Sequence, residues 1–107
     1  MSGIDDTDVL DVVAEDADGA CLLVMVETRP WGSDPEQLRQ LREKINTYAG
    51  AVLDGTVAGR FPQTAGRQVR IQLDCVEPPR DEFSLVVDHA ADQLRGLGVD
   101  FRTNVRS

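Results

Sequence analysis

Asp88 and His89 are the neighbouring residues of this chain that come nearest to an acid–base pair, in which a carboxylate orients an imidazole. The chain has no other histidine. Both residues fall in a predicted helix, where adjacent side chains diverge by about 100° and do not face each other. Ser84 lies five positions before His89, which again does not place the two side chains on one face. We therefore predict that His89 is a solvated surface residue and that the chain is not an enzyme.

Cys21 and Cys75 are the two cysteines, and each falls in a predicted strand. Two cysteines are too few for a disulfide framework, and one histidine with two separated cysteines does not form the usual tetrahedral zinc site. No basic segment precedes an apolar run, so we expect no signal peptide. We expect both thiols to be reduced and buried in a cytoplasmic protein, with no metal and no cofactor bound.

Asp16, Asp18 and Gly19 partly match the loop of a calcium-binding EF-hand. If Gly19 is the sixth position of that loop, the first and twelfth positions are Ala14 and Met25, where carboxylates are required. The match therefore fails. The segment is better interpreted as a turn, because glycine accepts a positive φ and aspartate bonds the local backbone.

Phosphate-binding motifs are missing from the chain. Residues 96–98 (Gly-Leu-Gly) follow a predicted helix rather than opening one, so they do not make a dinucleotide-binding loop. The nearest approach to a nucleic-acid surface is the set Arg60, Phe61, Arg67 and Arg70, which is small beside the acidity of the chain. We predict no nucleic-acid binding and no membrane binding, since the longest apolar run is also far too short to span a bilayer.

The charge of the chain is concentrated near its beginning. The formal net charge is -8: residues 1–34 hold nine acidic residues and one arginine, whereas residues 35–107 hold ten acidic and ten basic residues. Such a field favours a basic protein partner and repels phosphate and anionic lipid. The alternative is that the acids only keep a small protein in solution. The length predicts a single globular domain, 1–107, with residues 1–6 as a candidate flexible acidic tail.

Six elements must position these residues, in the order β-β-α-β-α-β. Residues 7–14 and 20–28 are rich in apolar and β-branched residues and predict two strands that form a hairpin. Residues 56–66 carry glycines and a proline and predict a loop. The remaining elements are the first helix, a strand over 68–76, a second helix over about 81–97 and a strand over 99–105.

The first helix is predicted to start at Ser33 or Asp34, with Glu36 or Gln37 completing a capping box, and to end at Gly55. Apolar residues at spacings of three and four form one stripe, which consists of Leu38, Leu41, Ile45, Tyr48 and Val52. The opposite side is predicted to be polar and comprises Arg39, Arg42, Glu43, Lys44 and Asn46.

The order of the elements predicts an α+β fold, a two-layer sandwich of a four-stranded mixed sheet and two helices. Right-handed crossovers place both helices on one face and give the strand order 1-2-3-4, with the first strand antiparallel to the rest. The other face is polar along the last two strands but apolar along the hairpin. We therefore predict an uncovered apolar patch that makes a homodimer through Val9, Leu10, Val12 and Val13. The alternative is that residues 1–6 or the C-terminal residues fold over this patch.

Two loops place a large aromatic residue close to an arginine. Arg29 and Trp31 follow the second strand, and Arg60 and Phe61 follow the first helix. Tryptophan and arginine are frequent in the parts of interfaces that dominate binding. Trp31 therefore has two interpretations, either an anchor that fastens the start of the helix to the core or a contact for a partner. Phe61 leaves the same choice open.

The run 41–48 (Leu-Arg-Glu-Lys-Ile-Asn-Thr-Tyr), followed by Asp54-Gly55, the pair Phe61-Pro62 and Gly66, resembles an uncharacterised family of small bacterial proteins that is defined only as a domain of unknown function. The resemblance includes Trp31 before the helix and extends over residues 4–105. It implies a bacterial origin and a single-domain protein. It implies no activity, cofactor or catalytic residue.

Two functions remain open. The favoured one is a non-enzymatic protein-interaction module that self-associates through the hairpin face, with a cognate inhibitor or immunity-type protein as a special case. The alternative is a small ligand-binding protein or enzyme with an anion-accepting pocket near Trp31, Arg29 and Arg60. A buried Trp31 together with a flat apolar hairpin face favours the module, whereas a pocket that holds both arginines beside an exposed Trp31 favours the alternative.

Overall fold

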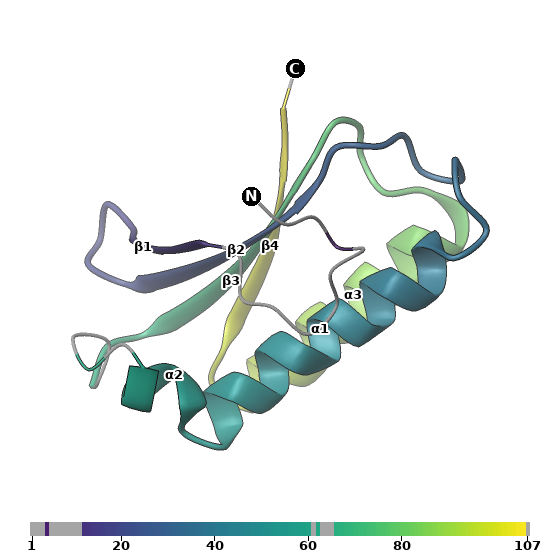
Figure 1. Ribbon diagram of the computed structural model, residues 1–107. Helices are drawn as coiled ribbons and strands as arrows, with labels where there is room; N and C mark the ends of the chain where they lie inside the picture. The colour runs from purple at the N-terminus through teal and green to yellow at the C-terminus, as the bar shows by residue number, and fades with distance from the viewer. Residues whose placement is uncertain (1–3, 5–11, 61, 63–65, 107) are drawn as a thin grey trace.

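The chain forms one four-stranded sheet with its two long helices packed on the same face, as the computed structural model in Figure 1 shows. The structure describes residues 4, 12–60, 62 and 66–106. Within these residues, no helix combines the length and the apolar character that crossing a membrane requires. The elements in chain order are β1 (Val12–Glu15), β2 (Cys21–Glu27), α1 (Gln37–Leu53), α2 (Thr56–Arg60), β3 (Val69–Cys75), α3 (Asp81–Gly96) and β4 (Asp100–Val105).

The strand order is β1-β2-β3-β4, which confirms the order predicted from the handedness of the crossovers. β1 is antiparallel to β2, and the other neighbouring strands are parallel. Cys21 lies opposite Val69, whereas Cys75 lies opposite Glu27 at the other end of the same strand pair. The two buried, free thiols are therefore about 20 Å apart along the sheet, too far for a disulfide.

The core lies between the sheet and the helices. Side chains alternate along β3, so that Ile71, Leu73 and Cys75 face the helices and are buried. Four residues of the stripe predicted for the first helix also face the core, namely Leu41, Ile45, Tyr48 and Val52, but Leu38 does not belong to it. The buried residues that the other elements contribute are Cys21, Leu23 and Met25 from β2, Leu41, Ile45 and Tyr48 from α1, and Val87, Ala90 and Leu94 from α3.

A short helix, α2, occupies part of the segment predicted to be a loop. Asp54 accepts a hydrogen bond from the Thr56 N–H at 2.9 Å, which shapes the turn before this helix, and Gly55 turns the chain at a φ of +84°. Val57 is buried and holds α2 against the core. The prediction failed here because five residues are too few to show a helical repeat.

Lys44 was predicted to lie on the polar side of the first helix, but its side chain is completely buried. Position 44 follows Leu41 by three residues and precedes Tyr48 by four, so it lies on the buried face of α1. The Lys44 Nζ atom lies 5.5 Å from the centre of the Tyr48 ring, which stabilises the charge by a cation–π contact.

The outer edge of β2 is partly closed beyond the end of β1. The Ile4 N–H donates to the Val26 carbonyl at 3.1 Å, and the Tyr48 hydroxyl donates to the Val24 carbonyl at 2.8 Å. Ile4 is fully buried, so this residue of the predicted acidic tail is part of the core. The rest of that tail lies outside the described residues.

The uncovered apolar patch predicted on the hairpin is not present along the described part of β2. Val24 and Val26 alternate with the core residues of β2, yet they are only 8% and 3% exposed. The predicted patch was therefore wrong for β2, whereas self-association through the hairpin stays a prediction, because Val9 and Leu10 lie outside the described residues.

Tyr48→Phe is expected to lower the free energy of unfolding by about 1 kcal/mol, because the Val24 carbonyl loses a buried donor while the ring and its packing stay. Urea-induced unfolding followed by circular dichroism measures this difference. Val76→Ala, at an exposed position, is the control and should change stability by less than about 0.5 kcal/mol. Equal stability of wild type and Tyr48→Phe would contradict the role assigned to the hydroxyl.

Candidate functional site

Trp31 is an anchor between the loops that follow β2 and β3. Its side chain is buried, and its indole Nε1–H donates to the Glu77 carbonyl at 2.9 Å. The Trp31 backbone N–H donates to the Glu77 carboxylate, and the ring centre lies 4.9 Å from that of Phe83 in α3. Arg80 donates to the Trp31 carbonyl at 2.7 Å. Of the two interpretations of Trp31, the structure supports the core anchor.

The start of α1 depends on Gln37 rather than on a complete capping box. Asp34 accepts a hydrogen bond from the Glu36 N–H at 2.8 Å, but the helix begins only at Gln37. The buried Gln37 amide accepts from the Gly32 N–H at 2.7 Å and donates to the Pro30 carbonyl at 3.3 Å. The loop that carries Trp31 is thus tied to the first turn of α1.

Arg29 is held by acidic and amide groups of its own chain. Its guanidinium bonds Glu27 at 2.9 Å, Asp34 at 3.2 Å and Gln40 at 2.8 Å. Gln40 is in the first turn of α1, whereas Arg60 ends α2 beyond the other end of α1. About 20 Å of helix lies between these ends. The structure therefore does not bring Arg29 and Arg60 together beside Trp31, as the anion-accepting pocket required.

The other residues predicted to make contacts are described in part or not at all. Val9, Leu10 and Phe61 lie outside the described residues. Val12 and Val13 are in β1, where their backbones lie opposite Val24 and Leu23 of β2. The contacts predicted for these residues therefore stay predictions.

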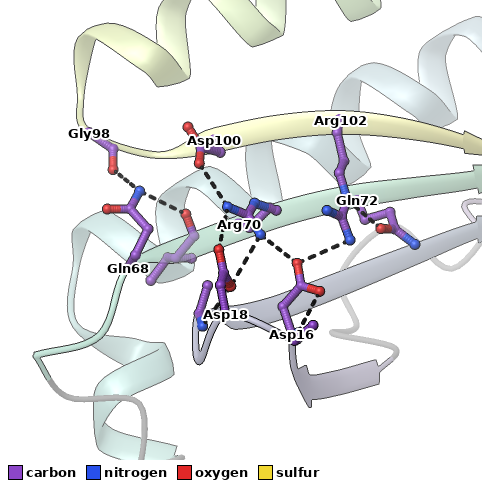
Figure 2. Close-up of polar contacts among 11 residues, drawn as sticks. Asp16, Asp18, Gln68, Arg70, Gln72, Gly98, Asp100 and Arg102 are labelled. Atoms are coloured by element: carbon purple, nitrogen blue, oxygen red, sulfur yellow. Dashed lines mark hydrogen bonds and ion pairs between the residues drawn. The ribbon is translucent and has the colours of Figure 1, made fainter.

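Arg70 is the centre of an ion-pair network on the face of the sheet opposite the helices (Figure 2). Its guanidinium bonds Asp16 and Asp18 of the hairpin turn, the latter at 3.2 Å, and Asp100 of β4 at 3.4 Å. Arg102 reaches Asp16 from β4 at 3.1 Å. The network connects the hairpin to the two parallel strands, and its acidic and basic groups compensate one another.

The pKa directions in this network follow its hydrogen bonds. The Ala17 N–H and then Arg70 lower the pKa of Asp16, and the Ala20 N–H and then Arg70 lower the pKa of Asp18. The hydrogen bonds that Arg70 donates to both carboxylates raise the pKa of Arg70. Asp16, Asp18 and Arg70 therefore stay charged near neutral pH, and their ion pairs fasten the hairpin turn.

Asp74 makes a second polar cluster farther along β3, and it is buried although the sequence predicted a solvated face. Its carboxylate accepts hydrogen bonds from Gln72 at 2.7 Å, Asn104 at 3.1 Å and Arg106 at 2.9 Å. Burial raises the pKa of Asp74, but the bonds from Asn104, Gln72 and Arg106 together outweigh burial and leave the pKa lowered.

α1 and α3 together line an open groove of about 910 Å³, hereafter the helix groove. Leu53, Leu85 and Leu97 border it and are 58%, 68% and 56% exposed. The remaining lining is Leu38, Arg42, Ile45, Asn46 and Ala49 from α1, and Glu82, Val86, His89, Ala90, Gln93 and Leu94 from α3. His89 is exposed at the rim, as predicted.

The sequence analysis missed the helix groove, although a signal for it exists. Leu85 and Leu97 lie outside the apolar stripe that α3 directs into the core, so α3 has apolar residues on a second face. Exposed apolar residues on one helix predict a groove only when a neighbouring helix contributes further apolar residues beside them. The pairing of α1 with α3 supplies those additional residues.

The described residues offer little for cofactor or thiol chemistry. They contain no group of three or more His, Cys, Asp and Glu side chains that could hold a metal ion. Burial raises the pKa of the Cys75 thiol to about 11 and also raises that of Cys21. Both thiols are therefore protonated near neutral pH, in the form that is weakly nucleophilic.

The fold and these surfaces define a small two-layer α+β domain whose two outer surfaces differ, one of ion pairs and one with an apolar groove. A family of unknown function, DUF6572, has a model that matches residues 1–107, and the chain belongs to this family. This confirms the resemblance to an uncharacterised family. No curated protein and no solved structure matches the chain.

Asp74→Asn is expected to destabilise the protein most at neutral pH. The folded-state pKa of Asp74 lies below its ordinary value of 3.8, so the carboxylate stabilises the fold above pH 4 and loses this effect as the pH falls through the folded-state pKa. We expect a loss of about 1–3 kcal/mol at pH 7, shrinking below pH 4. Urea unfolding at several pH values measures it.

The control for this experiment is Asp92→Asn, because the exposed Asp92 carboxylate bonds Arg95 on the surface of α3. A surface pair of this kind contributes little to stability, so the control should follow the wild type at every pH. A stability difference for Asp74→Asn that stays constant with pH would show that the charge of Asp74 does not contribute.

Proposed function

We propose that this chain is a non-enzymatic protein-interaction module that binds the apolar face of a partner's helix in the helix groove. The observation that carries the proposal is the exposure of Leu53, Leu85 and Leu97 around one groove. Single exposed leucines are common on protein surfaces, but several around one apolar depression are typical of a contact site.

The geometry of the groove fits a helix better than a small molecule. The groove is open and is bounded by two helices, so a third helix can pack with its ridges between those of α1 and α3. A helix with apolar residues at i, i+3, i+4 and i+7 would cover the three leucines with one face.

The charge of α3 supports a basic partner. Within Asp81–Gly96 the helix has four acidic residues and one arginine, and the whole chain has a net charge of -8. A cationic helix would approach the acidic surface of α3 faster than a neutral helix, and its binding would be weakened by salt. The partner we propose is therefore a basic amphipathic helix.

The buried Trp31 and the occupied guanidinium of Arg29 leave no support for the alternative anion-accepting pocket. The buried Val24 and Val26 likewise leave no support for association through the β2 face of the hairpin. A cytoplasmic location is part of the proposal and is supported by the two free thiols.

A labelled model peptide tests this function. The probe is a Lys/Leu peptide of about 16 residues whose leucines form one helical face, long enough to follow the groove. Fluorescence anisotropy should show saturable binding that weakens with salt. Leu85→Ser with Leu97→Ser should weaken binding at least about tenfold, because two of the three exposed leucines that border the groove are lost.

Two controls separate groove binding from general attraction to an acidic protein. A peptide of the same composition with its leucines distributed around the helix has the same charge but no apolar face. Val76→Ser removes an exposed apolar side chain that does not line the groove. Equal binding of both peptides, or equal weakening by Val76→Ser and by the leucine substitutions, would overturn the proposed function.

A further inference from the structure

Among the described residues, β4 is an edge strand of the sheet, since it pairs with β3 on one side and is last in the strand order. The Arg106 N–H donates to the Cys75 carbonyl at 2.7 Å, so the backbone groups of position 106 point toward β3. Backbone groups alternate in direction along a strand. Those of Phe101, Thr103 and Val105 therefore point away from the sheet, where a further strand would bond them.

We propose that β4 pairs with β4 of a second copy of this chain, in antiparallel orientation, about a two-fold axis at Thr103. The two sheets then form one continuous sheet of eight strands. A two-fold axis makes each contact occur twice, so a strand joins its own copy well only if its sequence is complementary to itself when reversed. This inference uses a different surface from the helix groove and does not rest on the proposed function.

The sequence of β4 meets this condition in one register. With the axis at Thr103, Asp100 lies opposite Arg106 of the second copy, and Phe101 lies opposite Val105 of the second copy. Thr103 faces itself, and Arg102 faces Asn104. Opposite charges, aromatic with β-branched residues, and Thr with Thr are all favourable cross-strand pairs. The three outward-pointing residues also oppose one another, so each can donate and accept a backbone hydrogen bond across the interface.

The side chains involved are available for these contacts. Asp100 and Arg106 each have an ion pair within the chain, with Arg70 and Asp74, yet their side chains are 53% and 54% exposed. Val105 is 43% exposed, and no residue of β4 is fully buried. In the paired sheet, Phe101 of the second copy would cover Val105, and the two unlike charges would meet across the strands.

The neighbouring register is unfavourable, which makes the axis at Thr103 specific. Moving the axis to Arg102 places Arg102 opposite Arg102 of the second copy, so two like charges oppose each other. That register also separates Asp100 from Arg106 and Phe101 from Val105. Like charges directly opposite one another destabilise a strand pair.

Thr103→Pro tests the proposal, because proline removes the N–H that points away from β3 and leaves the bonds between β3 and β4 in place. The oligomeric state of the full chain is measured by sedimentation equilibrium over a roughly hundredfold range of concentration. Wild type and Thr103→Val, which keeps the N–H, are expected to dimerise. Thr103→Pro is expected to remain a monomer with an unchanged circular dichroism spectrum.

A second variant keeps the test decisive if the proline variant does not fold. Val105→Lys places a charge opposite Phe101 of the second copy, a device by which edge strands avoid pairing. Val76→Lys is its matched control, since Val76 is 42% exposed and is not part of β4. Val105→Lys should abolish the dimer, and Val76→Lys should retain it.

Amide hydrogen exchange supplies a residue-level readout. In the dimer, the amides of Phe101, Thr103 and Val105 should exchange slowly, and dilution or Val105→Lys should make them fast. The amides of Arg102 and Asn104, directed toward β3, should stay slow in both cases.

Three outcomes would overturn the inference. They are a wild-type monomer at every concentration, a dimer that persists in both Thr103→Pro and Val105→Lys, and fast exchange of the three outward amides in a dimeric sample. None of these outcomes bears on peptide binding in the helix groove, so the two proposals fail separately.

Discussion

The insertion of Trp31 between the loops that follow β2 and β3 is the contact on which the rest of this architecture depends. Its indole bonds the Glu77 carbonyl, its ring packs on Phe83 of α3, and its carbonyl accepts from Arg80 just before α3. Gln37 ties the same loop to the first turn of α1. One buried side chain therefore sets where both long helices begin, and hence how their outer faces meet.

The polar face of the sheet is stabilised in a different way. Its charged side chains bond neighbouring groups of the chain rather than being solvated one by one. Arg70 binds the acidic groups of the hairpin turn, and Asp74 is surrounded by donors from β3, β4 and Arg106. Removing one member of such a cluster leaves its partners without a counter-charge, which costs more than the loss of an isolated surface pair. Part of the acidity counted in the first third of the chain is thus used to hold the hairpin.

The helix layer and the edge of the sheet present two different surfaces. The helix layer is left with exposed leucines around a groove, while the β4 edge carries a sequence that is complementary to its own reversal. The groove is lined by α1 and α3, whereas β4 is the last strand in the order of the sheet. A second copy at the edge and a partner helix in the groove would therefore occupy different parts of the protein.

Local periodicity by itself determined the strands and helices whose sequences show a clear repeat of apolar residues. The alternation through Ile71, Leu73 and Cys75 and the stripe through Leu41, Ile45 and Tyr48 arise from the pitch of a strand and of a helix, and chain handedness then determined the strand order. The site was predicted less completely than the fold. Of the predicted site residues that the structure describes, only Arg29 and Trp31 lie in a common loop.

Only the tertiary structure decided the features that depend on contacts between distant segments. The burial of Asp74 requires donors from another strand, the coverage of Val24 requires other parts of the chain, and the helix groove requires α1 beside α3. No local pattern encodes such contacts, because they join residues far apart in the chain. The sequence therefore determined the layers of this protein, and the packing of those layers decided which surfaces are left for partners.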